Sequence, residues 1–386
     1  MRIIKHILNS LIHLLEIWRI KKTDRANQKP RNNIKLFGGF FLSFEKIIMS
    51  NTMDSSFVNQ FDKYWNDKLD QLDSTLILNK QLIHGSRMRP ILAAWGYFMN
   101  CNDETHIPLE LLELCFSLEL LHKSSIIIDD LIDNDERRKG EKTFHAEFGE
   151  HKAVLFAISL IGKSFENIYS INSNYSSLFG KELAITLTDM SSGALQELSL
   201  NQRDILDIKK IDMIIHKETT TLIQNSLHLG FSLSSVNENA KLAAIVENIG
   251  YFCGYLFQIL NDLEPFMSTQ INKKYKGRTN FDIENNRKNH IVAFLYGNAS
   301  SSDREIIQKI INKEGSLSSP QTLLQLIEKY SICEKVLERA EEIQTKIFSE
   351  ISLLDNHIVS SQYVFDFSEF VKRMIKTSYL KLGINQ

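Results

Sequence analysis

The segment 126–140, which reads IIIDDLIDNDERRKG, carries the densest cluster of acidic side chains after an apolar run. Asp129 and Asp133 are four residues apart, so on a helix both carboxylates lie on one face, with Asp130 beside them. Like charges this close repel unless a cation neutralises them, and Mg²⁺ binds a few carboxylates together with phosphate oxygens. A solvated helix end is the plainer interpretation, but acids there oppose the helix dipole. We therefore predict that all three aspartates are Mg²⁺ ligands.

Two arginines, Arg137 and Arg138, directly follow the acidic residues. Guanidinium groups bind phosphate oxygens through two parallel hydrogen bonds. Surface pairing with Asp135 and Glu136 is the alternative. The order of acids and then arginines predicts a site for a diphosphate and its metal ion.

A second cluster of polar oxygens ends another apolar segment, FQILNDLEPF at 257–266. Asn261 and Asp262 supply further candidate metal ligands, and Gln258 lies one turn earlier. Two such clusters facing each other would border a cavity that is apolar below and ionic at its mouth. That cavity suits a long hydrocarbon with a diphosphate head.

Two weaker signals involve cations and hydroxyl groups. Arg87 and Arg89 stand at the start of a predicted helix, where backbone N–H groups also favour anions. Three consecutive threonines in HKETTTLI, 216–223, are unfavourable in a helix interior. They predict a local kink that presents Lys217 and the hydroxyl of Thr219 to a ligand, with a tolerated local weakness as the alternative.

The elements that must position these residues are helices. Only 5 prolines and 16 glycines occur in 386 residues, apolar residues recur at helical spacing, and no strand–helix alternation or glycine-rich phosphate loop is present. We predict an all-α fold, a single bundle of about a dozen helices around a deep apolar cavity. The helices are expected near 57–72, 87–99, 108–130, 144–170, 178–200, 206–232, 236–266, 287–297, 302–313, 319–357 and 361–381.

The N-terminal residues differ in composition from the rest of the chain. Residues 2–20 have apolar residues at helical spacing with interspersed cations, and 21–35 form a polar, basic linker. Residues 1–50 are therefore predicted to be an extension, with weak membrane-surface contact through 1–20. A packed helix, a frayed segment or a targeting peptide are the alternatives. Residues 51–386 are predicted to be the all-helical domain.

Charge and cysteine content restrict the class of protein. The formal net charge of −2 gives no basic field for nucleic acid, so no nucleic-acid partner is expected. The sequence contains no run of about 18 uncharged apolar residues, so we predict no membrane-spanning helix. The four cysteines are far apart in the sequence, which fits reduced thiols and a cytoplasmic protein.

From about residue 55 to 380 the chain resembles the trans-polyprenyl diphosphate synthases, which are class I isoprenoid synthases. The similarity is strongest in LELLHKSSIIIDDLIDNDERRKGEKTFHAEFG, which matches the family's first aspartate-rich region. The resemblance implies a helical prenyltransferase in which Mg²⁺ bridges Asp129, Asp133 and an allylic isoprenyl diphosphate. It also implies a homodimer, since the family is usually dimeric.

The resemblance extends to individual substrate-binding residues. Arg137 matches a position that holds the allylic diphosphate. Positions that hold isopentenyl diphosphate match Arg87, His122 and Arg138, and looser matches place Lys217, Gln258 and Lys276 in the site.

Several positions depart from the family pattern. The lysine expected for isopentenyl diphosphate is Ser86, and the second aspartate-rich motif begins with Asn261 and ends with Pro265. Chain elongation is the leading hypothesis. An aromatic or other non-isoprenoid acceptor, cyclisation on the same fold, and a non-catalytic partner subunit are the alternatives. Ser124 and Ser125 are small and stand one turn before Asp129, which predicts a long substrate or product, C15 to C20 or above.

Overall fold

The computed structural model describes residues 52–70, 85–101, 106–138, 140–171, 175–200, 207–234, 239–267, 290–312, 320–355 and 361–384. These residues all belong to one compact unit, Ile47–Gln386. The expectations for residues 1–50, and for Lys276 in the segment 268–289, concern positions outside the described residues.

Helices dominate the described residues, as the sequence predicts. The α-helices are α3 (Thr52–Asp70), α5 (Met88–Met99), α6 (Leu109–Ile132), α7 (Phe144–Phe148), α8 (Glu150–Ser170), α9 (Ser176–Ser199), α10 (Ile208–Ile215), α11 (Thr221–Ser234), α12 (Ala240–Met267), α15 (His290–Asn298), α16 (Ser301–Ile311), α17 (Pro320–Lys329), α18 (Ile332–Asp355) and α19 (Ser361–Lys381). A π-helical segment, η2 (His216–Thr220), joins α10 to α11. The strands β1 (Arg137–Arg138) and β2 (Glu141–Lys142) form a short antiparallel hairpin.

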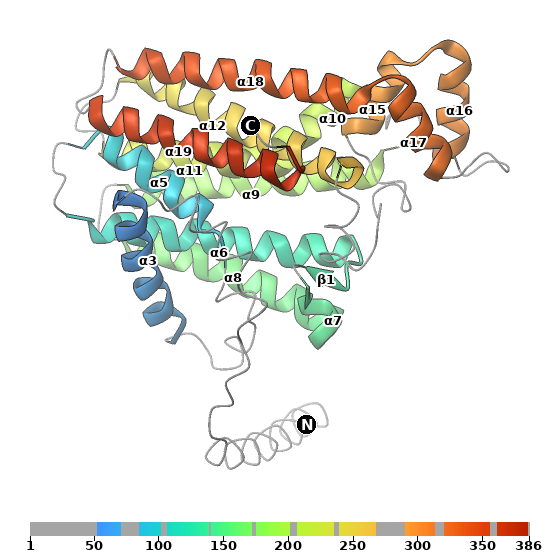
Figure 1. The fold of residues 1–386 in the computed structure, drawn as a ribbon. Coiled ribbons are helices and arrows are strands. Elements are labelled where there is room, and N and C mark those ends of the chain that lie inside the picture. Colours follow the sequence, from blue (N-terminus) through green and yellow to red (C-terminus); the bar gives the residue numbers. More distant parts are fainter. Residues whose placement is uncertain are drawn as a thin grey trace, which may run out of the picture. The chain divides into compact units, whose positions relative to one another are not determined.

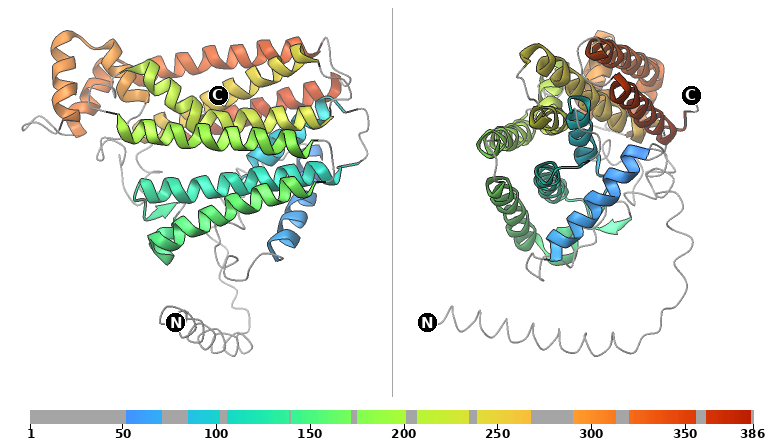
Figure 2. Two further views of the ribbon diagram at one scale, coloured as in Figure 1. Left: turned by 180° about the vertical axis from the view of Figure 1, so that it is seen from behind. Right: turned by 90° about the vertical axis from the view of Figure 1, so that its left-hand side faces the viewer.

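The long helices run side by side, and α15, α16 and α17 gather at one end of the unit (Figure 1). The views from behind and from the side show α6 and α8 as one pair beside the layer that contains α9 and α11 (Figure 2). Helix α6 packs against α5 and α8, and α12 packs against α11 and α18. Both α6 and α12 are strongly apolar because neighbouring helices cover much of their surfaces.

Close packing of α5 on α11 depends on two glycines. A Cβ at Gly96 would lie 2.1 Å from the backbone oxygen of Leu227, and a Cβ at Gly230 would lie 1.9 Å from that of Ala93. No larger side chain fits between backbones this close. This contact holds α5, which carries Arg89, against α11, the helix that directly follows η2.

Two segments that were each predicted to form one continuous helix are each divided into two helices. The helix predicted over 144–170 is divided at Gly149, whose φ of 90° ends α7 and starts α8 in a new direction. The helix predicted over 319–357 is divided between α17 and α18, where Ser331 has a φ of 49°. After α6 the chain forms the β1–β2 hairpin, which turns at Gly140 with a φ of 82°.

Among the described residues, α12 has the length and hydropathy of a membrane-crossing helix. More than half of its apolar window is buried inside the unit, against α11 and α18. These properties are those of a central helix in a helical bundle.

Candidate active site

The first acidic cluster lies at the C-terminal end of α6, as predicted. Asp130 is fully buried, whereas Asp129 is 57% exposed at the surface of the site. Arg138 bridges the two: its Nε lies 2.6 Å from Asp130 Oδ1 and its Nη2 lies 2.7 Å from Asp129 Oδ2. The hairpin that follows α6 folds Arg138 back over the acids, so this arginine does not pair only at the surface.

Burial and charge change the protonation of this cluster. Burial raises the pKa of Asp130 to about 6, although the Arg138 guanidinium acts in the opposite direction. Burial also lowers the pKa of Arg138, but the charges of Asp129 and Asp130 outweigh burial and raise it above its usual value. Asp130 Oδ2 is buried without a hydrogen-bond partner among the described atoms. The cluster therefore retains an oxygen that can bind a cation or accept a hydrogen bond.

Arg137 lies beside this cluster but is exposed. Its Nη1 donates to the backbone oxygen of Gly140 at 2.9 Å across the hairpin turn. The guanidinium is accessible to a ligand at the mouth of the site. Its predicted contact with an allylic diphosphate stays a prediction.

The kink predicted at the three threonines is confirmed: residues 216–220 form the π-helical segment η2. Thr221 Oγ1 donates to the backbone oxygen of His216 five residues earlier, at 2.9 Å, which satisfies part of the irregular backbone. Lys217 Nζ donates to Ser192 Oγ at 3.2 Å, and Thr219 Oγ1 donates to Gln258 Oε1 at 3.0 Å. The segment thereby links α9 on one side to α12 on the other.

Glu218, in the middle of η2, faces the first acidic cluster and was not among the predicted site residues. Burial raises its pKa to about 9, and the charges of Glu197, Asp129 and Asp133 add to this effect. Glu218 is also hydrogen-bonded to Glu197 near the end of α9. The sequence did not indicate that Glu218 faces the site, although its neighbours Lys217 and Thr219 were predicted site residues. Regular helical spacing does not hold across a π-turn, so it cannot show which side chains share a face there.

The second polar cluster is held by the same segment. Gln258 Nε2 donates to Asp262 Oδ1 at 2.7 Å, so Thr219, Gln258 and Asp262 form one hydrogen-bonded chain. Asp262 Oδ2 accepts from the backbone N–H of His290 at 3.1 Å. Asn261 is half-buried beside Asp262. Segment η2 thus lies between the two predicted clusters, with Glu218 facing the acids of α6 and Thr219 bonded to Gln258 of α12.

A network behind Asp262 was also missed from the sequence. Tyr255 donates to Asp212 Oδ1 at 2.6 Å, His290 Nε2 lies 3.5 Å from the same oxygen, and Arg339 Nη2 lies 3.1 Å from Asp212 Oδ2. Burial raises the pKa of Asp212, but hydrogen bonds from His290 and Tyr255 outweigh it and lower the pKa. His290 therefore ties Asp262 to α10, α12 and α18, which are far apart in sequence.

The predicted basic residues near α5 separate into two roles. Arg87 is buried between Asp62 Oδ1 at 2.9 Å and Glu119 Oε1 at 3.0 Å, and its guanidinium lies 4.7 Å from the ring centroid of Trp65. Arg89, the second residue of α5, lies with its Nη1 2.9 Å from His122 Nε2.

Arg89 is therefore the arginine that shares a location with His122. Burial lowers its pKa to about 10, and Glu119 opposes this change. Its Nε is buried and has no hydrogen-bond partner among the described atoms. The resemblance grouped Arg87 with His122, whereas the arginine that contacts His122 is Arg89. Arg87 adopts a left-handed backbone with a φ of 52°, which helical spacing does not anticipate.

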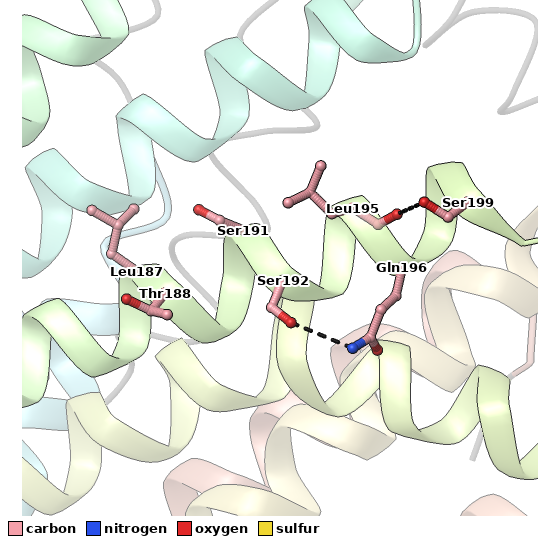
Figure 3. A pocket seen from close by; sticks show the side chains of 7 residues that line it. All are labelled: Leu187, Thr188, Ser191, Ser192, Leu195, Gln196 and Ser199. Atoms are coloured by element: carbon pink, nitrogen blue, oxygen red, sulfur yellow. Dashed lines mark hydrogen bonds between the residues drawn. The ribbon is translucent and has the colours of Figure 1, made fainter.

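An open groove of about 600 Å³ runs along α9. Seven residues of α9 line it: Leu187, Thr188, Ser191, Ser192, Leu195, Gln196 and Ser199. Figure 3 shows Leu187, Ser191 and Leu195 on the side of α9 that faces α6. Ser192, which accepts from Lys217, lies at the edge where the groove meets η2. The groove surface is mostly apolar, and the ammonium of Lys217 lies beside it, bonded to Ser192.

Within the described part of the chain, no three His, Cys, Asp or Glu side chains are already arranged to hold a metal ion. Mg²⁺ commonly binds only one or two protein carboxylates and takes its other ligands from water and substrate phosphates. Asp129 and Asp130 offer hard oxygen ligands of this kind, and Asp130 Oδ2 has no other partner among the described atoms. The residues therefore fit Mg²⁺ bound together with a diphosphate.

Comparison with known proteins identifies the family. The sequence profile described as polyprenyl synthetase matches residues 75–328. A short chain isoprenyl diphosphate synthase of Methanocaldococcus jannaschii is 27% identical over 242 residues, which cover 62% of this chain and 71% of that protein. Heptaprenyl diphosphate synthase component 2 of Bacillus subtilis is 22% identical over 307 residues, covering 75% and 84%.

Solved structures share the fold. The geranylgeranyl pyrophosphate synthetase of Pyrococcus horikoshii has a TM-score of 0.72 at 20% identity, covering 86% of this chain and 99% of that one. A polyprenyl synthase of Caulobacter crescentus, complexed with calcium and isoprenyl diphosphate, has a TM-score of 0.70 at 15% identity, covering 86% and 97%. The predicted all-α isoprenoid synthase fold is confirmed. The chain belongs to the polyprenyl synthetase family, and the predicted enzyme class, a prenyltransferase, is confirmed with it.

Proposed function

We propose that this protein is a Mg²⁺-dependent prenyl diphosphate synthase that extends an allylic isoprenyl diphosphate with isopentenyl diphosphate. One observation carries the proposal. Segment η2 faces the acidic end of α6 through Glu218, bonds to the Gln258–Asp262 chain of α12 through Thr219, and bonds through Lys217 to Ser192, which lines a mostly apolar groove on α9. A charged mouth over an apolar groove suits a diphosphate with a hydrocarbon tail. The names of the relatives, all prenyl diphosphate synthases, support the same reaction.

The acids and arginines at the mouth would handle the leaving group. Asp129 and Asp133 would hold Mg²⁺, which would supply positive charge to stabilise the leaving diphosphate. Arg137 is exposed beside them and can place its guanidinium on the same diphosphate. Lys217 and Thr219 present an ammonium and a hydroxyl from η2 toward this region.

The groove along α9 would bind the hydrocarbon tail. Leu187 and Leu195 give it apolar side chains that the tail would cover. The alkene of isopentenyl diphosphate then forms the new carbon–carbon bond, and a proton leaves the adjacent carbon. The released diphosphate can accept that proton, so no side-chain base is required.

Isopentenyl diphosphate would bind at the buried cations near the start of α5. Arg89 and His122 lie 2.9 Å apart there, and the buried Nε of Arg89 has no partner among the described atoms. His122 stands seven residues before Asp129 on α6, about two helical turns away. This separation allows two diphosphates to bind on one face of the helix without sharing ligands.

We also propose that the protein is a cytoplasmic homodimer. Helix α8 exposes three large apolar side chains at Val154, Leu155 and Ile158, with Leu155 67% exposed. Helix α9, which packs on α8, exposes Leu178 and Ile185. Such apolar surface is typical of a protein interface, and a second copy offers a self-complementary partner. The free cysteines support a reducing compartment.

The reaction is tested by incubating purified protein with Mg²⁺ and geranyl, farnesyl or geranylgeranyl diphosphate, with and without isopentenyl diphosphate. Mass spectrometry is expected to detect an elongated diphosphate only when isopentenyl diphosphate is present. A hydrocarbon product formed without isopentenyl diphosphate would instead indicate cyclisation. No product under any condition would contradict the proposal and favour a non-catalytic subunit.

A further inference from the structure

Of the two candidate metal ligands on α12, Asp262 alone is a carboxylate, because Asn261 is a neutral amide. The two oxygens of Asp262 accept hydrogen bonds from different elements. Gln258 Nε2, on the same helix, donates to Oδ1 at 2.7 Å, and the backbone N–H of His290 donates to Oδ2 at 3.1 Å. The second donor is 28 residues away in the sequence, at the first residue of α15. The direction of the Asp262 carboxylate therefore depends on where α15 begins.

The imidazole of His290 fixes the start of α15. The ring is fully buried and stacks on Phe294, with the two centroids 5.8 Å apart. It also meets the ring of Tyr255 edge-on, at 6.3 Å between centroids, and its Nε2 lies 3.5 Å from Asp212 Oδ1. A ring packed on several sides cannot shift without moving its own backbone. The side chain of His290 thus holds in place the N–H group that Asp262 accepts from.

Asp212, on α10, is in turn held by side chains of two other helices. The hydroxyl of Tyr255 on α12 donates to Oδ1 at 2.6 Å, and Arg339 Nη2 on α18 donates to Oδ2 at 3.1 Å. Arg339 also donates to the Tyr255 hydroxyl, which closes a ring of three side chains. Helices α10, α12 and α18 all contact α15. Asp212 therefore joins the three helices against which the start of α15 packs.

A comparable network elsewhere in the described residues serves as a structural comparison. Asp303, on α16, also pairs with a tyrosine hydroxyl and a cation, those of Tyr330 and Lys329. Its remaining hydrogen bonds go to Ser300, which caps the same helix. Both carboxylates thus connect helices in a similar way. They differ in one respect, since Asp212 contacts the residue whose backbone orients a candidate metal ligand.

Outer hydrogen-bond partners commonly orient the carboxylates that bind metal ions, and their loss reduces metal affinity. Gln258 and the His290 N–H are neutral donors, so they fix the direction of the Asp262 carboxylate without neutralising it. Orientation matters more where a cluster carries little charge, and Asn261 contributes none on α12. A change in the contacts of His290 should therefore alter metal binding at Asp262.

We propose that Asp212, together with Tyr255 and Arg339, is a positioning residue for Asp262: it holds His290 so that the backbone N–H keeps the carboxylate directed for Mg²⁺ bound with a diphosphate. This inference rests on the proposed function, since it concerns the metal ligand of α12 in the same site. Asp212 and its two partners touch no substrate in this account. An ion pair between α10 and α18 thus sets the affinity of α12 for the metal ion.

The test uses calorimetry to measure binding of inorganic diphosphate to the full-length protein over a range of Mg²⁺ concentrations, which requires no turnover. Asp212→Asn keeps the size of the side chain but removes its charge. It is expected to raise the Mg²⁺ concentration for half-maximal binding roughly 10- to 100-fold. Tyr255→Phe removes one hydrogen bond and should raise it roughly 2- to 10-fold. The matched variants Asp303→Asn and Tyr330→Phe should bind as the wild type does.

A double variant separates positioning from a purely structural role. In an Asp262→Asn background, Asp212→Asn should change the Mg²⁺ requirement less than about twofold, because the carboxylate that it positions is already absent. An equally large change in both backgrounds, or no change in the wild-type background, would overturn the proposal. If Asp212→Asn does not fold, as judged by circular dichroism, Tyr255→Phe in the same two backgrounds decides by the same criterion.

The two proposals fail in distinguishable ways. If the wild type elongates but Asp212→Asn keeps the wild-type Mg²⁺ requirement, only the positioning role is contradicted. If diphosphate binding depends on Mg²⁺ and Asp212 but the wild type forms no elongated product, only the proposed reaction is contradicted. A wild type that does not bind diphosphate with Mg²⁺ overturns the positioning role directly.

Discussion

At the scale of single residues, Asp130 shows how environment divides the roles of neighbouring acids. Asp129 is exposed and pairs with the outer nitrogen of Arg138, whereas Asp130 is fully buried and pairs with the inner one. The exposed acid can exchange its arginine for a metal ion. The buried acid anchors the arginine and keeps the hairpin folded over the site. Asp129 is therefore better placed than Asp130 to bind metal directly.

Glu218 provides a pH-dependent prediction in metal-free protein. Its pKa is raised to about 9 from an ordinary value of 4.5, so the folded state holds a proton that the unfolded state releases. Its contribution to stability is fully present below pH 4.5 and is lost as the pH rises through 9. Glu218→Gln imitates the protonated acid, so its melting temperature should exceed that of the wild type increasingly from pH 5 to pH 9, by on the order of a few degrees.

The same substitution at the exposed Glu166 of α8 serves as the control and should show no such trend. A melting-temperature difference between Glu218→Gln and wild type that stays constant from pH 5 to pH 9 would contradict the placement of Glu218 among Glu197, Asp129 and Asp133.

At the scale of elements, the close contact of α5 with α11 sets the helix that carries Arg89 against the helix that follows η2. Gly230→Ala would place a Cβ 1.9 Å from a backbone oxygen of α5, so we expect a loss of about 3 kcal/mol or more in the free energy of unfolding. Gly162→Ala on α8 meets nothing within 4 Å and should be neutral or stabilise the helix by about 0.5–1 kcal/mol. Urea denaturation of both variants measures the difference, and equal stabilities would argue against this packing.

The groove between α6 and α9 leads to a prediction about chain length. Ser125 is small, and its hydroxyl donates to the backbone oxygen of His122 at 2.9 Å. Ser125→Phe should fill the space one turn below Asp129 and shorten the longest product, whereas Ser125→Ala should leave it unchanged. Mass spectrometry of the products decides. An unchanged product distribution in Ser125→Phe would mean that the tail does not pass this side of α6.

Much of the site could be predicted from the sequence because its signals are local. The acids of α6, the arginines after them and the threonines of η2 are recognised by residue type and short spacing. Glu218 could not be predicted in the same way. Its role depends on which elements pack around it, and a π-turn or a left-handed residue such as Arg87 changes which side chains share a face.

The fold shows the same division. Helix content and the positions of the main helices follow from the apolar pattern and the scarcity of breakers. The breaks at Gly149 and Ser331 depend on positive backbone φ angles, and periodicity does not report these angles. The network of Asp212, Tyr255 and Arg339 joins three helices that only the tertiary structure brings together.

At the scale of the whole molecule, the apolar surface of α8 and α9 predicts self-association. Leu155→Glu places a charge in the centre of the exposed apolar residues, so we expect it to convert a dimer into a monomer without loss of helix content. Light scattering coupled to gel filtration measures the mass. The exposed Lys163→Gln variant serves as the control, and a wild type that is monomeric at micromolar concentration would contradict the dimer.

The most direct test of the whole account is diphosphate release by the full chain with an allylic isoprenyl diphosphate, Mg²⁺ and isopentenyl diphosphate. Asp129→Ala and Asp133→Ala should each reduce the rate at least about 100-fold, because each removes a carboxylate that holds the metal at the leaving group. Glu166→Ala, a surface change on α8, should keep the wild-type rate. Diphosphate release at the wild-type rate in Asp129→Ala or Asp133→Ala would contradict the central claim.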